Sequence, residues 1–128
     1  MKKLFSLFAA VLFAGSMMAE TSTLTFTAKC NGSGTADDEA VWTVTSDGTE
    51  STYESSKGIH YGTSSAQVGY IQLATSSILG TITKVVVNAS AASDVSANVS
   101  VSVGGTAFTS GAETSVAVSS TATDYTFT

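Results

Sequence analysis

Few side chains in this chain are able to do acid–base, nucleophilic or metal chemistry. It has one histidine, His60, and one cysteine, Cys30. A hydrolytic triad needs a base beside a nucleophile and a third group that orients the base, and the serines include no Gly-x-Ser-x-Gly elbow. A zinc site needs more nitrogen or sulfur ligands than His60 and Cys30 supply. The sequence therefore predicts that the protein is not an enzyme.

The densest group of carboxylates is the run Asp37, Asp38 and Glu39, which follows a glycine-rich turn. Calcium takes about six to eight oxygen ligands from carboxylates and carbonyls, and loops at the edges of sandwiches often supply them. The three carboxylates are therefore candidate calcium ligands, with Asn31 and Asp124 as further oxygen donors. The alternative is a solvated acidic loop that keeps the sheet edge soluble.

A second candidate site is aromatic. Tyrosine and tryptophan combine an apolar ring with a polar tip, and exposed rings of this kind stack on sugars. Tyr53 and Tyr61 lie among serines and glycines and are expected to be partly exposed, with His60 beside them as a hydrogen-bonding group. These three are the candidate ligand-binding residues, for a glycan. The alternative for His60 is a structural or surface role, and Trp42 is expected in the core.

Apolar residues alternate with serine and threonine along most of the chain after residue 20. Leu24 and Phe26 alternate with threonines, and Val99, Val101 and Val103 alternate with serines. This period of two is typical of strands with one buried and one wet face. The predicted strands are 22–28, 40–46, 50–54, 58–62, 68–75, 81–89, 97–103, 106–109, 114–119 and 123–128. Many short strands with no helical stripe indicate an all-β protein, a sandwich or a barrel.

Three local features refine this prediction. Gly104 and Gly105 fill a two-residue gap between extended runs, which predicts a hairpin. The run 82–87 is almost continuously apolar, which predicts a central strand covered on both faces. The chain stops inside the strand-like run 124–128, so we expect an edge there that is open to association.

The first nineteen residues have the layout of a secretory signal peptide. Lys2 and Lys3 precede an apolar stretch from Leu4 to Gly15, and Ala19 is a small residue at a plausible cleavage point. The stretch is too short for a stable membrane span. We therefore expect residues 1–19 to be a cleaved leader and residues 20–128 to be a single exported domain, with no membrane insertion after cleavage. The expected destination is the medium or the cell surface, and the periplasm is the alternative.

The charge of the chain after this leader limits its partners. Three lysines stand against ten carboxylates, a formal charge of −7, and arginine is absent. Binding of phosphate groups needs clustered cations, so nucleic acid is excluded as a partner and an anionic membrane surface is disfavoured. Cys30 lies too far beyond the leader to carry a lipid anchor, and we expect it to be a half-buried structural residue.

Several segments carry a resemblance to a known module. They are residues 42–47 (WTVTSD), 57–64 (KGIHYGTS), 80–89 (GTITKVVVNA) and 101–105 (VSVGG), together with the leading strand 23–26 (TLTF). This set resembles a module that recurs in secreted and surface proteins of gut Bacteroidetes. The resemblance implies a jelly-roll sandwich similar to galactose-binding-like and carbohydrate-binding modules, with no catalytic residues. It also implies one or two further strands at the C-terminal side, so that this chain is a C-terminally truncated form.

Together these observations predict an all-β, antiparallel β-sandwich of jelly-roll type that is exported and non-catalytic. Its expected function is glycan binding or attachment to a surface, with a glycan or another surface protein as partner. The alternative is a structural or assembly subunit that associates through an open edge strand. Exposed aromatic side chains on one face would favour the first function, and self-association through a free edge would favour the second.

Overall fold

The computed structural model describes residues 5–8, 21–48, 51–77 and 79–128, and these residues form β-strands and no helix. The predicted all-β class is therefore confirmed. The strands are β1 (Phe5–Phe8), β2 (Ser33–Thr35), β3 (Val41–Ser46), β4 (Ser51–Glu54), β5 (Gly58–Tyr61), β6 (Ile71–Ala74), β7 (Val85–Ala91), β8 (Asn98–Val99), β9 (Ser102–Val103), β10 (Thr106–Ala107), β11 (Val116–Ala117) and β12 (Thr123–Phe127).

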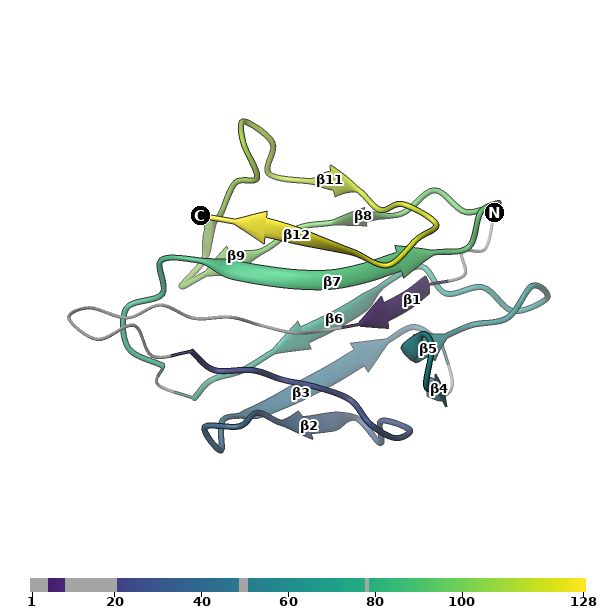
Figure 1. The fold of residues 1–128 in the computed structure, drawn as a ribbon, viewed down its shortest axis with the longest axis horizontal. Helices are drawn as coiled ribbons and strands as arrows, with labels where there is room; N and C mark the ends of the chain where they lie inside the picture. The colour runs from purple at the N-terminus through teal and green to yellow at the C-terminus, as the bar shows by residue number, and fades with distance from the viewer. Residues whose placement is uncertain (1–4, 9–20, 49–50, 78) are drawn as a thin grey trace.

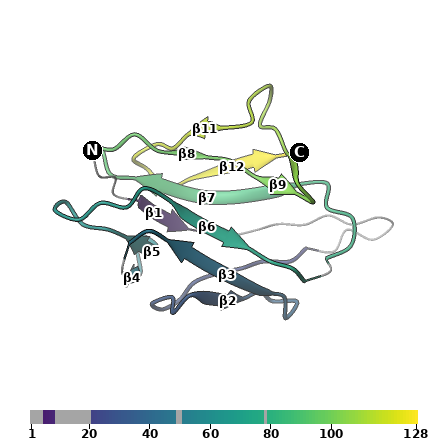
Figure 2. The same cartoon turned by 180° about the vertical axis from the view of Figure 1, so that it is seen from behind.

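The strands pack as an antiparallel sandwich. The larger sheet has the order β12-β7-β1-β5-β4, and a second sheet has the order β2-β3-β6. Two short pairs, β8 with β11 and β9 with β10, complete the described structure. β7 and β12 lie on the near side in Figure 1, and β3 and β6 lie on the near side in Figure 2, where the molecule is seen from behind. Every pairing of neighbouring strands is antiparallel, as predicted.

The core lies between the two sheets, where every second side chain of a strand is apolar and points inwards. In β3, Trp42 and Val44 are buried whereas Val41 is 57% exposed. In β12, Tyr125 and Phe127 are buried and the residues between them are exposed. Trp42 therefore lies in the core, as expected from its apolar surroundings. Burial of apolar surface is the main stabilising contribution to such a fold.

One local prediction is confirmed, and a second is confirmed in part. Gly104 and Gly105 both have positive φ angles, 57° and 81°, and join β9 to β10 with Val103 opposite Thr106. A two-residue turn of this kind needs left-handed backbone at both positions, which glycine adopts without steric cost. The apolar run 82–87 leads into β7, which is central as predicted because it pairs with β12 on one side and β1 on the other. The predicted cover on both faces is only partial, since Val85 is buried whereas Val86 and Val87 are half-buried.

Several predicted strands have the wrong length, including 106–109, which shortens to β10, and 114–119, which shortens to β11. The strand predicted at 81–89 begins only at Val85, and that predicted at 68–75 shortens to β6. The strand predicted at 97–103 is divided, because β8 pairs with β11 whereas β9 pairs with β10. A strand ends where its partner strand ends. The alternation of residues within one segment does not show which other segment will pair with it, so it does not predict the length of the strand.

The segment 22–28 shows the predicted alternation of burial as far as Phe26, but Ala28 is exposed and the segment is not a strand. Ser22, Leu24 and Phe26 point inwards in alternation. Its backbone bonds go to a turn instead of a ladder: the Asp37 amide donates to the Thr23 carbonyl over 3.0 Å, and the Thr23 amide donates to Asp37 Oδ1 over 2.7 Å. Alternating burial therefore arises here without a partner strand.

Strand β2 was not predicted, because Ser33-Gly34-Thr35 has no apolar alternation. It forms because Gly34 lets the segment lie under two apolar side chains. A Cβ at Gly34 would stand 2.7 Å from Phe26 Cε1 and 2.9 Å from Leu24 Cδ1. Both separations are well inside van der Waals contact, so this position requires the absence of a side chain.

Gly34→Ala is therefore expected to lower the free energy of unfolding by about 1–3 kcal/mol, as overpacking of a core does. Denaturant unfolding of the full chain measures this loss. Ser33→Ala is the matched control, since Ser33 is exposed on the same strand. An equal loss for both variants would contradict the contact with Leu24 and Phe26.

The described part of the predicted leader has a place in the larger sheet. Phe5–Phe8 forms β1, which pairs antiparallel with β5 on one side and β7 on the other. The predicted cleavage point after Ala19 lies outside the described residues. We expected no contribution of the leader to the domain, and the pairing of β1 with β5 and β7 differs from that expectation.

Candidate functional site

The predicted ligand-binding residues lie on the β4–β5 hairpin but do not share a face. Tyr53 is opposite Ile59 and Thr52 is opposite His60. Because side chains alternate along a strand, Tyr53 and Tyr61 point to the core side and His60 points to the other. Tyr61 is only 5% exposed, so the expectation of a partly exposed ring is wrong for this residue. Tyr53 is half-buried against the core.

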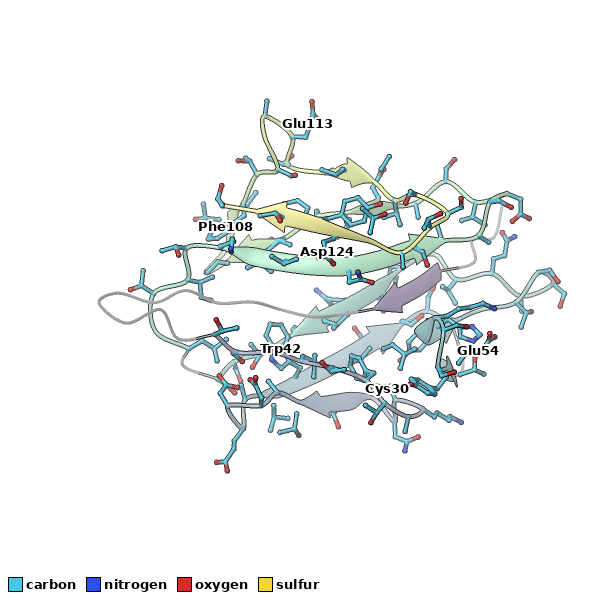
Figure 3. The ribbon with its side chains drawn as sticks, viewed as in Figure 1. Cys30, Trp42, Glu54, Phe108, Glu113 and Asp124 are labelled. Carbon is cyan, nitrogen blue, oxygen red and sulfur yellow. The ribbon has the colours of Figure 1, made fainter. Side chains whose placement is uncertain are left out.

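His60 belongs instead to a small polar cluster on the outer face of the hairpin. The Thr52 hydroxyl lies 2.8 Å from His60 Nε2, and Glu54 Oε1 lies 3.3 Å from the same nitrogen. The Lys57 ammonium forms an ion pair with Glu54 Oε2 over 2.7 Å. Figure 3 shows Glu54 at this hairpin. The contacts tie β4, its turn and β5 together, which gives His60 a structural role.

Lys57 sets the charge state of this cluster. The hydrogen bond from its ammonium lowers the pKa of Glu54 below the ordinary value for a glutamate. Stabilisation by the ionised carboxylate is therefore present above the ordinary pKa and is lost as the pH falls through the lowered one. Because both side chains are about half exposed, the pair contributes little to stability.

Lys57→Ala is expected to raise the pKa of Glu54 towards its ordinary value, because the stabilising hydrogen bond is removed. The free energy of unfolding is expected to change little at neutral pH, because the pair is exposed to solvent. A carboxyl-carbon NMR titration of Glu54 measures the pKa. Lys84→Ala removes the same charge elsewhere and is the control; equal shifts in both variants would mean that net charge, and not the contact, sets the pKa.

The predicted calcium ligands lie in the turn between β2 and β3. Asp37 and Asp38 each accept a backbone hydrogen bond, from Thr23 N over 2.7 Å and from Ala40 N over 3.1 Å. Glu39 has a left-handed backbone with φ 68°, which lets the turn between β2 and β3 close. Within the described residues, no three His, Cys, Asp or Glu side chains are grouped so as to hold a metal ion. The prediction of a calcium site in this loop is therefore not supported by its geometry.

Asp124, one of the two further oxygen donors predicted for that site, lies elsewhere. Asp124 is on β12, directly opposite Asn88 of β7, and its Oδ1 accepts a hydrogen bond from Asn88 Nδ2 over 2.6 Å. Figure 3 shows Asp124 on the upper sheet, away from the β2–β3 turn. The carboxylate therefore pairs two neighbouring strands.

A site that the sequence did not indicate lies between β6 and the chain that carries β8 and β9. It is a groove of about 1000 Å³, lined by residues 69–75 on one flank and 97–104 on the other. We call it the β6–β9 groove. Further lining residues are Trp42, Ser77, Leu79, Gly80, Ile82, Val85 and Val87.

The β6–β9 groove is uncharged, and its lining mixes polar and apolar side chains about equally. None of the described residues that line it is charged. Ile71, Leu73, Val99, Val101 and Val103 are only half-buried although they pack against the core. Apolar side chains left partly open in one hollow are typical of an interaction surface.

Each flank of the β6–β9 groove also ends a sheet. Among the described strands, β6 pairs only with β3, β8 only with β11 and β9 only with β10. The start of the β6 flank is held in place by Asp47, whose Oδ1 accepts hydrogen bonds from Gly69 N over 2.8 Å and Tyr70 N over 3.3 Å. Tyr70 is 49% exposed at this end of the groove.

Sequence reasoning missed the groove because its flanks are separated by some twenty residues and are individually ordinary strands. The signal available was the pair of alternating valine and isoleucine runs, which mark inward faces but do not say which strands are neighbours. Nothing in the sequence around Tyr70 indicated that its ring would lie at the end of a groove.

Comparison with protein-family models, curated proteins and solved structures found no match to this chain. The resemblance to the Bacteroidetes module therefore stays a prediction. No helix within the described ranges is long and apolar enough to cross a membrane.

Proposed function

We propose that this protein is a non-catalytic β-sandwich module of an exported assembly, and that it binds an extended peptide segment in the β6–β9 groove. This is the structural role that the sequence raised as an alternative to glycan binding. The single observation that carries the proposal is the pair of strand edges that face one hollow. Unpaired edges present rows of backbone donors and acceptors, and strand addition uses them for affinity.

The size of the groove supports an extended occupant. A strand rises about 3.3 Å per residue, lies about 4.8 Å from its neighbour and occupies a layer about 10 Å deep, so it fills roughly 160 Å³ per residue. The volume of about 1000 Å³ therefore has room for a strand of about six residues. Insertion would also cover Leu73 and Val101, which are half-buried now.

The uncharged lining determines the chemistry of the occupant. A charged side chain inserted among Ile71, Leu73 and Val101 would lose its water without gaining an opposite charge. The expected partner is therefore a neutral segment in which apolar residues alternate with serine or threonine. The segment of this chain from residue 97 to 104 has this pattern and serves as the probe.

The test measures binding of a labelled peptide that copies residues 97–104 to the full chain by fluorescence anisotropy. We expect saturable binding that Val101→Asp weakens at least tenfold, because it places an unpaired charge in the groove. Val41→Asp is the matched control, since Val41 is exposed on β3 outside the groove. The control is expected to bind as the unmodified chain does.

Two results would contradict the proposal. One is the absence of any binding by the full chain. The other is equal binding of a control peptide in which the valines are replaced by proline, because proline lacks the N–H that a strand donates. Size-exclusion with light scattering on the same variants reports whether the bound segment is supplied by a second copy of the chain.

Glycan binding remains the second candidate, and Tyr70 is the observation that favours it. Its ring is the large aromatic side chain exposed at the groove, with Gln72 and Asn98 among the lining residues. Tyr70→Ala is expected to abolish a glycan interaction while leaving peptide binding intact. A glycan array probed with the full chain and this variant distinguishes the two functions.

A further inference from the structure

We propose that the gap filled by β1, between β5 and β7, is a second binding site for an extended peptide strand, and that β1 is its occupant within this chain. The partner that fits is a short apolar segment of another polypeptide that runs antiparallel to both neighbours. The site lies in the larger sheet, so the inference does not rest on the β6–β9 groove.

The pairing of β1 defines the site. Phe5, Ser6 and Leu7 lie opposite Tyr61, His60 and Ile59 of β5. On the other side, the four residues of β1 lie opposite Ala91, Ser90, Ala89 and Asn88 of β7. β1 is therefore a central strand with a partner along both edges. Without it, β5 and β7 would each end in an open edge, about 10 Å apart, which is the width that one strand bridges.

The neighbours of the gap set the pattern of the occupant. At the register positions of residues 5 and 7, the flanking residues are Ile59, Tyr61, Ala89 and Ala91, and all four are buried. The position of Ser6 is flanked by His60 and Ser90, which are half-buried on the opposite face. A strand that fits has apolar residues at its first and third positions and tolerates a polar residue between them.

The position of β1 in the sequence means that cleavage of the leader would open the site. β1 belongs to the segment that the sequence predicts to be removed at export. Removal would take away a central strand and leave buried apolar residues such as Ile59 and Ala89 beside an empty position. Two open strand edges that face each other, with apolar residues along both, can pair with a strand from another chain. Processing of the leader would then convert a filled sheet into a strand-accepting one.

The experiment uses the full chain with a site-specific protease sequence inserted between residues 19 and 20. The protein is folded with its leader intact and is cut afterwards. A labelled peptide that copies residues 3–10 is then added in excess, and its uptake is followed by anisotropy and native mass spectrometry. We expect saturable uptake after cutting and none before it, because β1 occupies the site in the uncut chain.

The matched control peptide carries Ser6→Pro and Leu7→Pro, which remove two backbone donors from the strand. It is expected to bind at least tenfold more weakly. Retention of the cut leader as a non-covalent complex, displaced only by excess of the unmodified peptide, would also support the site. The Val101→Asp variant is expected to take up this peptide normally, which separates the site from the β6–β9 groove.

Three outcomes would overturn the inference. In the first, the leader leaves after cutting, thermal unfolding is unchanged and no peptide is taken up. In the second, the cut protein unfolds and excess peptide does not restore its cooperative transition. In the third, Val101→Asp abolishes uptake, which would place the peptide in the β6–β9 groove and not between β5 and β7.

Discussion

Replacing Phe127 with alanine is expected to lower the free energy of unfolding by about 3–5 kcal/mol. The side chain has no exposed surface, and its strand, β12, pairs with β7 in the larger sheet. Truncation leaves a cavity in addition to the lost apolar burial, and both effects act in the same direction. A loss of this size is a large part of the stability of a single small domain, so much of the variant is expected to be unfolded at 37 °C.

Denaturant unfolding of the full chain measures this effect, and Thr126→Ala is its matched control. Thr126 is the exposed neighbour on the same strand, so its replacement is expected to change stability by less than about 0.5 kcal/mol. Phe127→Leu is expected to fall between the two, because most of the apolar volume is kept. A similar loss for Thr126→Ala and Phe127→Ala would contradict the inward orientation of Phe127.

Leu24→Ala is expected to cost about 2–5 kcal/mol, although Leu24 lies in a segment without a strand ladder. Its side chain is completely buried, whereas Thr25 beside it is exposed. The loss therefore measures side-chain packing alone, since the segment makes few backbone hydrogen bonds to lose. Thr25→Ala is the control and is expected to have little effect; a small loss for Leu24→Ala would show that the segment is not part of the core.

The same variant tests the contact between Leu24 and Gly34. A Cβ at Gly34 would meet both Phe26 Cε1 and Leu24 Cδ1, and shortening Leu24 removes the second of these contacts while that with Phe26 stays. The double variant Leu24→Ala, Gly34→Ala is therefore expected to be more stable than the sum of the single losses predicts, by about 0.5–1 kcal/mol. Strict additivity would mean that the two positions do not touch.

At the candidate sites, the sequence did not predict the orientation of the side chains or their local hydrogen bonds. Tyr53, His60 and Tyr61 lie on one hairpin that the sequence did not predict, and residue type alone did not reveal which face of it each residue occupies. The carboxylates at 37–39 were recognised as a loop, but oxygens of Asp37 and Asp38 accept hydrogen bonds from the backbone amides of Thr23 and Ala40. Local hydrogen bonds of this kind depend on the closed turn, which the spacing of the acidic residues does not specify.

The sequence by itself determined the all-β class, the alternating burial of strands such as β3 and β12, and the hairpin at Gly104 and Gly105. Each follows from local physics: the pleat alternates side chains between two faces, and glycine adopts positive φ angles at no steric cost.

Only the tertiary structure decided which strands are neighbours. It placed β1 between β5 and β7, divided the run 97–103 between two partners, and left β6 facing β9 across a groove. The physical reason is that strand pairing joins segments distant in sequence, and its free energy depends on the partner and not on the segment alone.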